Sequence, residues 1–237
     1  MAEQAKISAA EKKKLIKHRR VVRYFIDAAV QIVQDEGIDA LTIRKVADAA
    51  GYNSATLYNY FENLDQLIAF TCIDVTQEWR MALAEIYSSG RNVLYQYLEG
   101  WRQFCEKSWM NTDCYSYIYI EHTDAVIQQF RAYDELFCEE EGKEIPVFSD
   151  IYRQKTLLAQ EQATIAPVIA AGYIDEQDAE SIYNIALLLF EGLVSRTKRV
   201  KRAGGQIKNY TDEFMFYFVG FVRSKLKEEI DLSEYLS

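Results

Sequence analysis

Residues that interrupt helices are scarce in this sequence, which has 10 glycines and 2 prolines among 237 residues. Long stretches contain neither residue, and this composition is typical of helical proteins rather than of turn-rich β-sandwiches. Hydrophobic residues make up 49% and charged residues 27% of the chain, which argues against general disorder. We therefore expect an all-α globular fold.

Cysteine and histidine are also scarce, with four and two copies. The four cysteines show no C-x-x-C spacing, so the sequence predicts neither a disulfide framework nor a zinc cluster. We expect reduced thiols, no metal site and no cofactor. The cysteines are Cys72, Cys105, Cys114 and Cys138.

The signatures of two further protein classes are absent. The sequence has no glycine-rich phosphate loop, no G-x-S-x-G and no H-E-x-x-H motif, so we expect a protein that is not an enzyme. No apolar run approaches the roughly 18 residues that a membrane span needs. The lysine-rich N-terminus has no apolar segment behind it, so we expect a cytoplasmic protein without a membrane partner.

Charge is distributed unevenly along the chain. The total is −9, yet residues 1–23 hold eight basic side chains against two acidic ones, and residues 66–237 carry a net charge of −10. A basic arm on an acidic body suits a protein that presents one end to a polyanion. A solvated, disordered terminus is the alternative that charge alone leaves open.

The N-terminal third predicts two helices that are followed by a glycine. Apolar residues recur at three- and four-residue intervals over 17–36, and Gly37 provides a C-terminal stop. Thr42 is a favourable N-cap for a second helix that runs to Ala50. Gly51 can adopt the left-handed conformation that ends this helix.

A third helix is expected at once, with Asn53 as its N-cap and Ser54–Tyr60 as its body. Two helices that cross around a glycine turn form a helix-turn-helix, whose second helix can lie in the major groove of DNA. Asn59 could pair with adenine, and small side chains such as Ala55 could touch a thymine methyl group. A purely structural helix pair remains the alternative. The residues expected to face outward are Ser54, Ala55, Thr56, Tyr58 and Asn59.

The stretch "LTIRKVADAAGYNSATLYNYFENLDQLI" resembles the DNA-binding domain of TetR-family transcriptional regulators over roughly residues 20–70. The resemblance implies a homodimeric repressor. It implies phosphate contacts from Thr42 and Tyr58, and Lys45 is a further predicted phosphate contact because of its position on the same helix. It places these side chains at base edges: Arg44, Ser54, Ala55, Thr56 and Asn59.

Two positions depart from the family pattern, because Tyr60 and Leu64 stand where the family commonly has a histidine and a lysine. These departures weaken the prediction of contacts to the DNA phosphates, and they do not affect the prediction of the fold. Alternatives also remain for two predicted contacts. Arg44 could be a solvated partner of Asp48 at i+4, and Tyr58 could pack against the first helix.

The chain divides into a DNA-binding domain at 1–63 and a helical effector-binding and dimerisation domain at 64–237. One helix is expected over 65–88, connecting the first domain to the second. Pro167 should kink its helix or divide it. The other predicted helices are 92–109, 112–121, 123–140, 149–171, 176–203 and 209–230.

Two C-terminal helices carry wide apolar stripes, and dimerisation is their expected use. The family resemblance places an intersubunit four-helix bundle here, so the DNA site should be near-palindromic. The alternative is that both stripes are fully buried within one subunit. The predicted interface residues are Ile182, Leu189, Phe190, Phe214, Phe218 and Phe221.

Ten aromatic residues fall between Tyr95 and Tyr133. We expect some of them to line an effector cavity, which the family resemblance also places in these helices. A cationic or planar apolar small molecule would suit aromatic rings beside a carboxylate. The predicted ligand contacts are Tyr97, Trp101, Phe104, Tyr117, Glu121 and Tyr133.

These expectations combine into a ligand-responsive DNA-binding repressor. Its homodimer would bind double-stranded DNA, and a small molecule in the cavity would stabilise a conformation that releases the DNA. A helical small-molecule-binding or interaction protein with a structural helix-turn-helix is the alternative.

Overall fold

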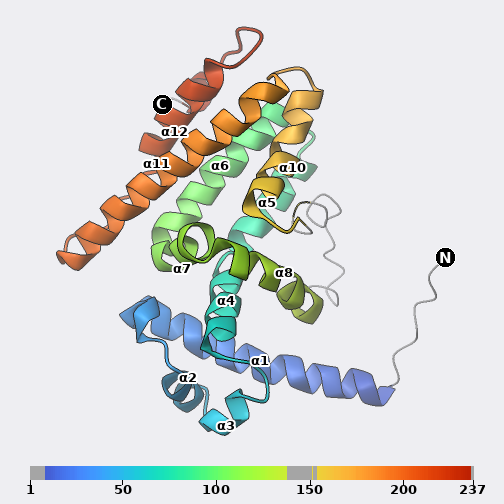
Figure 1. Cartoon of the computed structure of the whole chain (residues 1–237), viewed down its shortest axis with the longest axis vertical. Helices are drawn as coiled ribbons and strands as arrows, with labels where there is room; N and C mark the ends of the chain where they lie inside the picture. The colour runs from blue at the N-terminus through green and yellow to red at the C-terminus, as the bar shows by residue number, and fades with distance from the viewer. Residues whose placement is uncertain (1–8, 138–150, 152–153, 236–237) are drawn as a thin grey trace.

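The computed structural model describes residues 9–137, 151 and 154–235. Every regular element in these residues is helical, which confirms the predicted all-α fold. Figure 1 shows α1 to α3 at one end of the molecule and a larger group of helices at the other, with α4 running between them. The α-helices are α1 (Ala9–Glu36), α2 (Ile43–Ala49), α3 (Ser54–Leu57), α4 (Leu64–Val75), α5 (Gln77–Ser88), α6 (Val93–Met110), α7 (Thr112–Ser116), α8 (Thr123–Phe137), α10 (Leu157–Ala170), α11 (Glu176–Arg202) and α12 (Thr211–Arg223). The shorter turns are η1 (Ile38–Ala40), the π-helical η2 (Tyr117–Glu121) and η3 (Ser233–Tyr235).

Helix α1 starts earlier than predicted, at Ala9 rather than near residue 17. The segment "AAEKKKLIKHRR" contains good helix formers and neither glycine nor proline, so it continues the helix towards the N-terminus. The basic segment is therefore helical over residues 9–23, and the alternative of a disordered terminus is wrong there. The rest of the predicted arm, residues 1–8, lies outside the described residues.

The predicted caps of the helix-turn-helix are confirmed. The amide of Lys45 donates to Thr42 Oγ1 at 3.2 Å, and the amide of Thr56 donates to Asn53 Oδ1 at 2.8 Å. Gly51 has a φ of +77°, which lets the chain turn sharply between α2 and α3. Helix α3 ends at Leu57, earlier than predicted, because the chain continues into a tighter i to i−3 turn after it.

The predicted single helix over 65–88 is wrong, because it breaks at Thr76 between α4 and α5. The hydroxyl of Thr76 and the side-chain amide of Gln77 both donate to the carbonyl of Ile73, at 2.8 and 3.2 Å. That carbonyl would otherwise accept the helical bond from the Gln77 amide. Side-chain competition of this kind ends or bends helices, and it places a joint between the two groups of helices.

Three further boundaries differ from the predictions. Helix α10 passes through Pro167 as one element, and it starts at Leu157 rather than at 149. Helix α12 ends at Arg223 rather than near 230. Residues 138–140, 149–150 and 152–153 of the predicted helices lie outside the described residues. None of the described helices combines the length and the hydropathy that crossing a membrane requires.

Candidate DNA-binding surface and ligand cavity

The eight predicted DNA contacts lie on α2 and α3 or in the turns that flank them, together at one end of the molecule (Figure 1). None of them is buried, so the helix-turn-helix presents these side chains at the surface. Lys45, Ser54 and Thr56 are half-buried, and the exposed members are Thr42, Arg44, Ala55, Tyr58 and Asn59.

The charged residues of this surface are held only weakly. The Arg44 side chain is 88% exposed, and its Nε lies 3.8 Å from Asp48 Oδ2, as the i+4 alternative predicted. An exposed pair of this kind contributes little, so it leaves the guanidinium available. Lys45 forms an ion pair with Glu36 at the end of α1, which any phosphate would have to displace.

Packing explains the departure from the family pattern at Tyr60, whereas the nearby Tyr58 stays at the surface. Tyr58 is 58% exposed, so most of its ring remains available for contact. The ring of Tyr60 instead packs against His18 and Phe25 of α1, with centroid distances of 4.9 and 5.9 Å. Position 60 therefore holds α1 to the helix-turn-helix.

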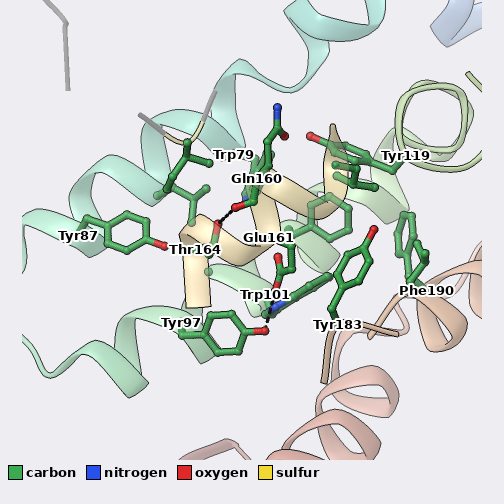
Figure 2. A pocket seen from close by; sticks show the side chains of 16 residues that line it. Trp79, Tyr87, Tyr97, Trp101, Tyr119, Gln160, Glu161, Thr164, Tyr183 and Phe190 are labelled. Atoms are coloured by element: carbon green, nitrogen blue, oxygen red, sulfur yellow. Dashed lines mark hydrogen bonds between the residues drawn. The ribbon is translucent and has the colours of Figure 1, made fainter. Parts of the chain in front are cut away.

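An aromatic cavity lies in the larger group of helices, between α5, α6, α10, α11 and η2 (Figure 2). Its empty volume is about 760 Å³, a figure that includes open solvent at the cavity mouth. Three predicted residues line it: Tyr97, Trp101 and Phe104. The other lining residues are Trp79, Leu83, Tyr87, Gly100, Tyr119, Ile151, Leu157, Gln160, Glu161, Thr164, Tyr183, Leu187 and Phe190.

The remaining predicted ligand contacts are not part of this lining, and we correct the predicted set accordingly. Glu121 accepts a hydrogen bond from Ser116 at 2.7 Å and forms an ion pair with Lys198. The ring of Tyr117 packs against His122. Tyr133 is occupied in a cluster at the junction between α1 and the body.

This junction cluster consists of Arg23 on α1, Asp74 on α4, and Tyr133 and Phe137 on α8. Arg23 and the hydroxyl of Tyr133 both donate to Asp74 Oδ1. The Arg23 guanidinium also lies 4.3 Å from the centroid of the Phe137 ring. The cluster joins the helix that carries the helix-turn-helix to two helices of the body.

Glu161 is the polar centre of the cavity, and the sequence analysis missed it. The hydroxyl of Tyr97 donates to Glu161 Oε1 at 2.7 Å. Figure 2 shows this carboxylate between Tyr97, Trp101 and Tyr183. Burial raises the pKa of Glu161 to about 7, although hydrogen bonds from Tyr97 and Trp101 oppose this rise. The sequence does contain an indication of this buried acid, because Glu161 falls on the apolar stripe of α10 between Leu157 and Ile165.

Glu161 should make the stability of the protein depend on pH. In the unfolded chain this carboxyl ionises near its ordinary pKa of 4.5, whereas the folded protein keeps the proton until about pH 7. The folded state therefore loses stability as the pH rises between these values, and the cost stays constant above them. Glu161→Gln should consequently stabilise the protein by about 1–3 kcal/mol at pH 8, and should have little effect near pH 4.

Urea unfolding of the two proteins across this pH range would measure the difference. Glu85→Gln on α5 is the matched control, because Glu85 is exposed and lies outside the cavity. A difference between wild type and Glu161→Gln that did not change with pH would contradict the assigned proton.

The predicted dimer residues are mostly interior. Four of them expose 1% or less and belong to the core of one subunit, so they cannot form a surface: Ile182, Phe190, Phe214 and Phe218. Leu189 and Phe221 are half-buried. The outer faces of α11 and α12 instead expose 64% of Leu188, 58% of Phe216 and 55% of Tyr217. The stripes were wide enough for a core and a partner, and the prediction selected the core side.

Comparisons with known proteins agree with this arrangement. Residues 25–69 match the model of the tetR family of bacterial regulatory proteins. The chain is 34% identical over 62 residues to the HTH-type transcriptional regulator BetI of Cronobacter sakazakii, a match over 26% of this chain that spans only 31% of that relative.

Solved structures extend the similarity to the whole fold. Thermus thermophilus FadR, a TetR-family transcriptional repressor in complex with lauroyl-CoA, aligns over 85% of this chain and 92% of its own, with 14% identity and a TM-score of 0.53. A TetR transcription regulator from Haloarcula marismortui aligns over 88% of this chain and 99% of its own, with 15% identity and a TM-score of 0.53. Residues 25–69 therefore carry a tetR-family DNA-binding domain, and the chain as a whole has the fold of these regulators.

Proposed function

We propose that the protein is a ligand-responsive transcriptional repressor that binds a near-palindromic DNA site as a homodimer. The observation that carries the proposal is the pairing of an exposed helix-turn-helix with an aromatic cavity in the same chain, connected through α4. We retain the division at residue 63 as a proposal, with DNA binding before it and ligand binding and dimerisation after it.

The dimer would form through the outer faces of α11 and α12. These helices pack against each other, and on each of them an exposed apolar residue, Leu188 or Phe216, lies one turn before an exposed glycine, Gly192 or Gly220. A Cβ atom added at either glycine would meet no atom within 4 Å, so a second helix pair could approach closely there. A two-fold dimer would offer two copies of α3 to half-sites one helical turn, or a multiple of it, apart.

Ligand binding would reach the DNA-binding surface through the joint at Thr76. Trp79 lies in the cavity wall, one turn beyond this joint, and Asp74 lies just before it. A ligand that moved α5 would move α4 and strain the junction cluster around Arg23. The two copies of α3 would then lose their common register on the DNA, which requires the ligand to favour the non-binding state.

Selection of bound fragments from a random pool of DNA duplexes tests DNA binding and dimer spacing together. The expected result is an inverted repeat, with a logarithm of affinity that falls linearly with the logarithm of salt concentration. Absence of any enriched sequence and of any salt dependence would favour a ligand-binding protein whose helix-turn-helix is structural.

Arg44→Ala should weaken binding to the selected site by roughly 1–3 kcal/mol and relax specificity at one base pair, as expected for a guanidinium that reads guanine. Fluorescence anisotropy with single-base variants of the site would measure this. Arg131→Ala is a matched control, because Arg131 on α8 is 83% exposed and also pairs at i+4, with Glu135. An equal loss on every site variant would instead identify Arg44 as a phosphate contact.

A further inference from the structure

The lining of the cavity combines aromatic rings with charge of one sign only. It contains one carboxylate, Glu161, and no lysine, arginine or histidine among the residues that the structure describes. Half of its sixteen residues are aromatic. The faces of aromatic rings carry partial negative charge, so the rings and the carboxylate together favour a positively charged guest.

Among the described residues, Glu161 has no cationic partner, in contrast to other enclosed carboxylates of this protein. Arg23 pairs with Asp74, and Arg80 forms two 2.8 Å hydrogen bonds to Asp134. Within the described part of the chain, Glu161 has only the neutral hydrogen-bond donors Tyr97 and Trp101. Since enclosed carboxylates are normally paired with a cation, a positively charged guest would supply the partner that the described residues do not provide.

We propose that the cavity binds an organic cation of the ammonium class. Its charge would lie against the carboxylate of Glu161, among the rings of Tyr97, Trp101 and Tyr183 that Figure 2 shows around it. This inference rests on the proposed function, in which a small molecule occupies this cavity.

Binding should release a proton. The other titratable groups in the lining are Tyr87 on α5, Tyr97 on α6, Tyr119 on η2 and Tyr183 on α11, and phenols keep their protons near neutral pH. Burial raises the pKa of Tyr183 to about 12. Glu161, with a pKa of about 7, is therefore the group that would ionise when a cation arrives.

Isothermal titration calorimetry with benzyltrimethylammonium and its neutral carbon isostere, neopentylbenzene, tests the inference. The wild-type protein should bind the cation more tightly than the isostere. Glu161→Gln should weaken cation binding at least tenfold and leave the isostere unaffected or tighter. Glu85→Gln, the matched control, should change neither. Repeating the titration at about pH 6 in buffers of different ionisation enthalpy should reveal proton release in the wild type and none in Glu161→Gln.

Failure of the cation to bind, equal binding of the isostere, or an unchanged affinity in Glu161→Gln would overturn the inference. Operator release distinguishes this failure from failure of the proposed function. If the neutral isostere released the protein from DNA and the cation did not, the proposed ligand-responsive regulation would be supported and the proposed cation site would be wrong. If the cation bound through Glu161 without changing the affinity for the DNA site, the cation site would be supported and the proposed regulation by a ligand would be wrong.

Discussion

Replacing both Leu188 and Tyr217 by glutamate should convert the protein to a monomer and weaken operator binding at least about 100-fold. Both side chains are more than half exposed in the single subunit, so the substitutions should leave its fold intact. In a two-fold dimer the same surface faces itself, and four carboxylates would be buried close together. The monomer would keep one half-site and lose the effective concentration that joins two reading helices.

Analytical ultracentrifugation and fluorescence anisotropy on the selected site would measure both effects. A matched control replaces Met81 and Met110 by glutamate, because these side chains are 53% and 80% exposed and lie on α5 and α6. The control should remain dimeric and bind DNA normally. If the variant at 188 and 217 stayed dimeric, the dimer interface would have to lie elsewhere on the protein. If it became monomeric and bound DNA with undiminished affinity, DNA binding would not require a dimer.

The helix-turn-helix could be predicted because its determinants are local. Thr42 and Asn53 cap helices within three residues of themselves, and Gly51 supplies the turn at its own position. The break at Thr76 was missed because Thr76 lies inside an uninterrupted apolar periodicity. It arises from competition by side chains for one carbonyl, to which a hydrophobic pattern is insensitive.

The ligand cavity was only partly predictable, because its wall is assembled from distant segments. The aromatic run located Tyr97, Trp101 and Phe104, but the acid that faces them comes from α10, more than fifty residues further along. Glu121 was chosen as the carboxylate because it is close to the aromatic residues in sequence. In the fold, however, Glu121 forms an ion pair with Lys198. Which of several acids meets a cation of the same chain is decided only by tertiary structure.

Phe25→Ala should be the most damaging single substitution for DNA binding, although Phe25 does not touch DNA in our proposal. Its side chain is fully buried, and its ring lies 5.1, 5.9 and 6.2 Å from the ring centroids of Tyr52, Tyr60 and Phe61. It thus holds α1 to the helix-turn-helix. Truncation of a buried phenylalanine costs about 3–5 kcal/mol, most of the stability of a domain this small.

The proposed division at residue 63 makes the outcome specific. Hydrogen exchange should show lost protection over α1 to α3 but retained protection in α6, α11 and α12, and operator binding should disappear while cavity binding persists. Tyr24→Ala is the control, since Tyr24 is the preceding residue of α1 and is 47% exposed. If Phe25→Ala unfolded the whole chain in one transition, the two parts would form a single cooperative unit. Contacts of α4 with both α1 and α8 would then couple the two ends through shared stability as well as through geometry.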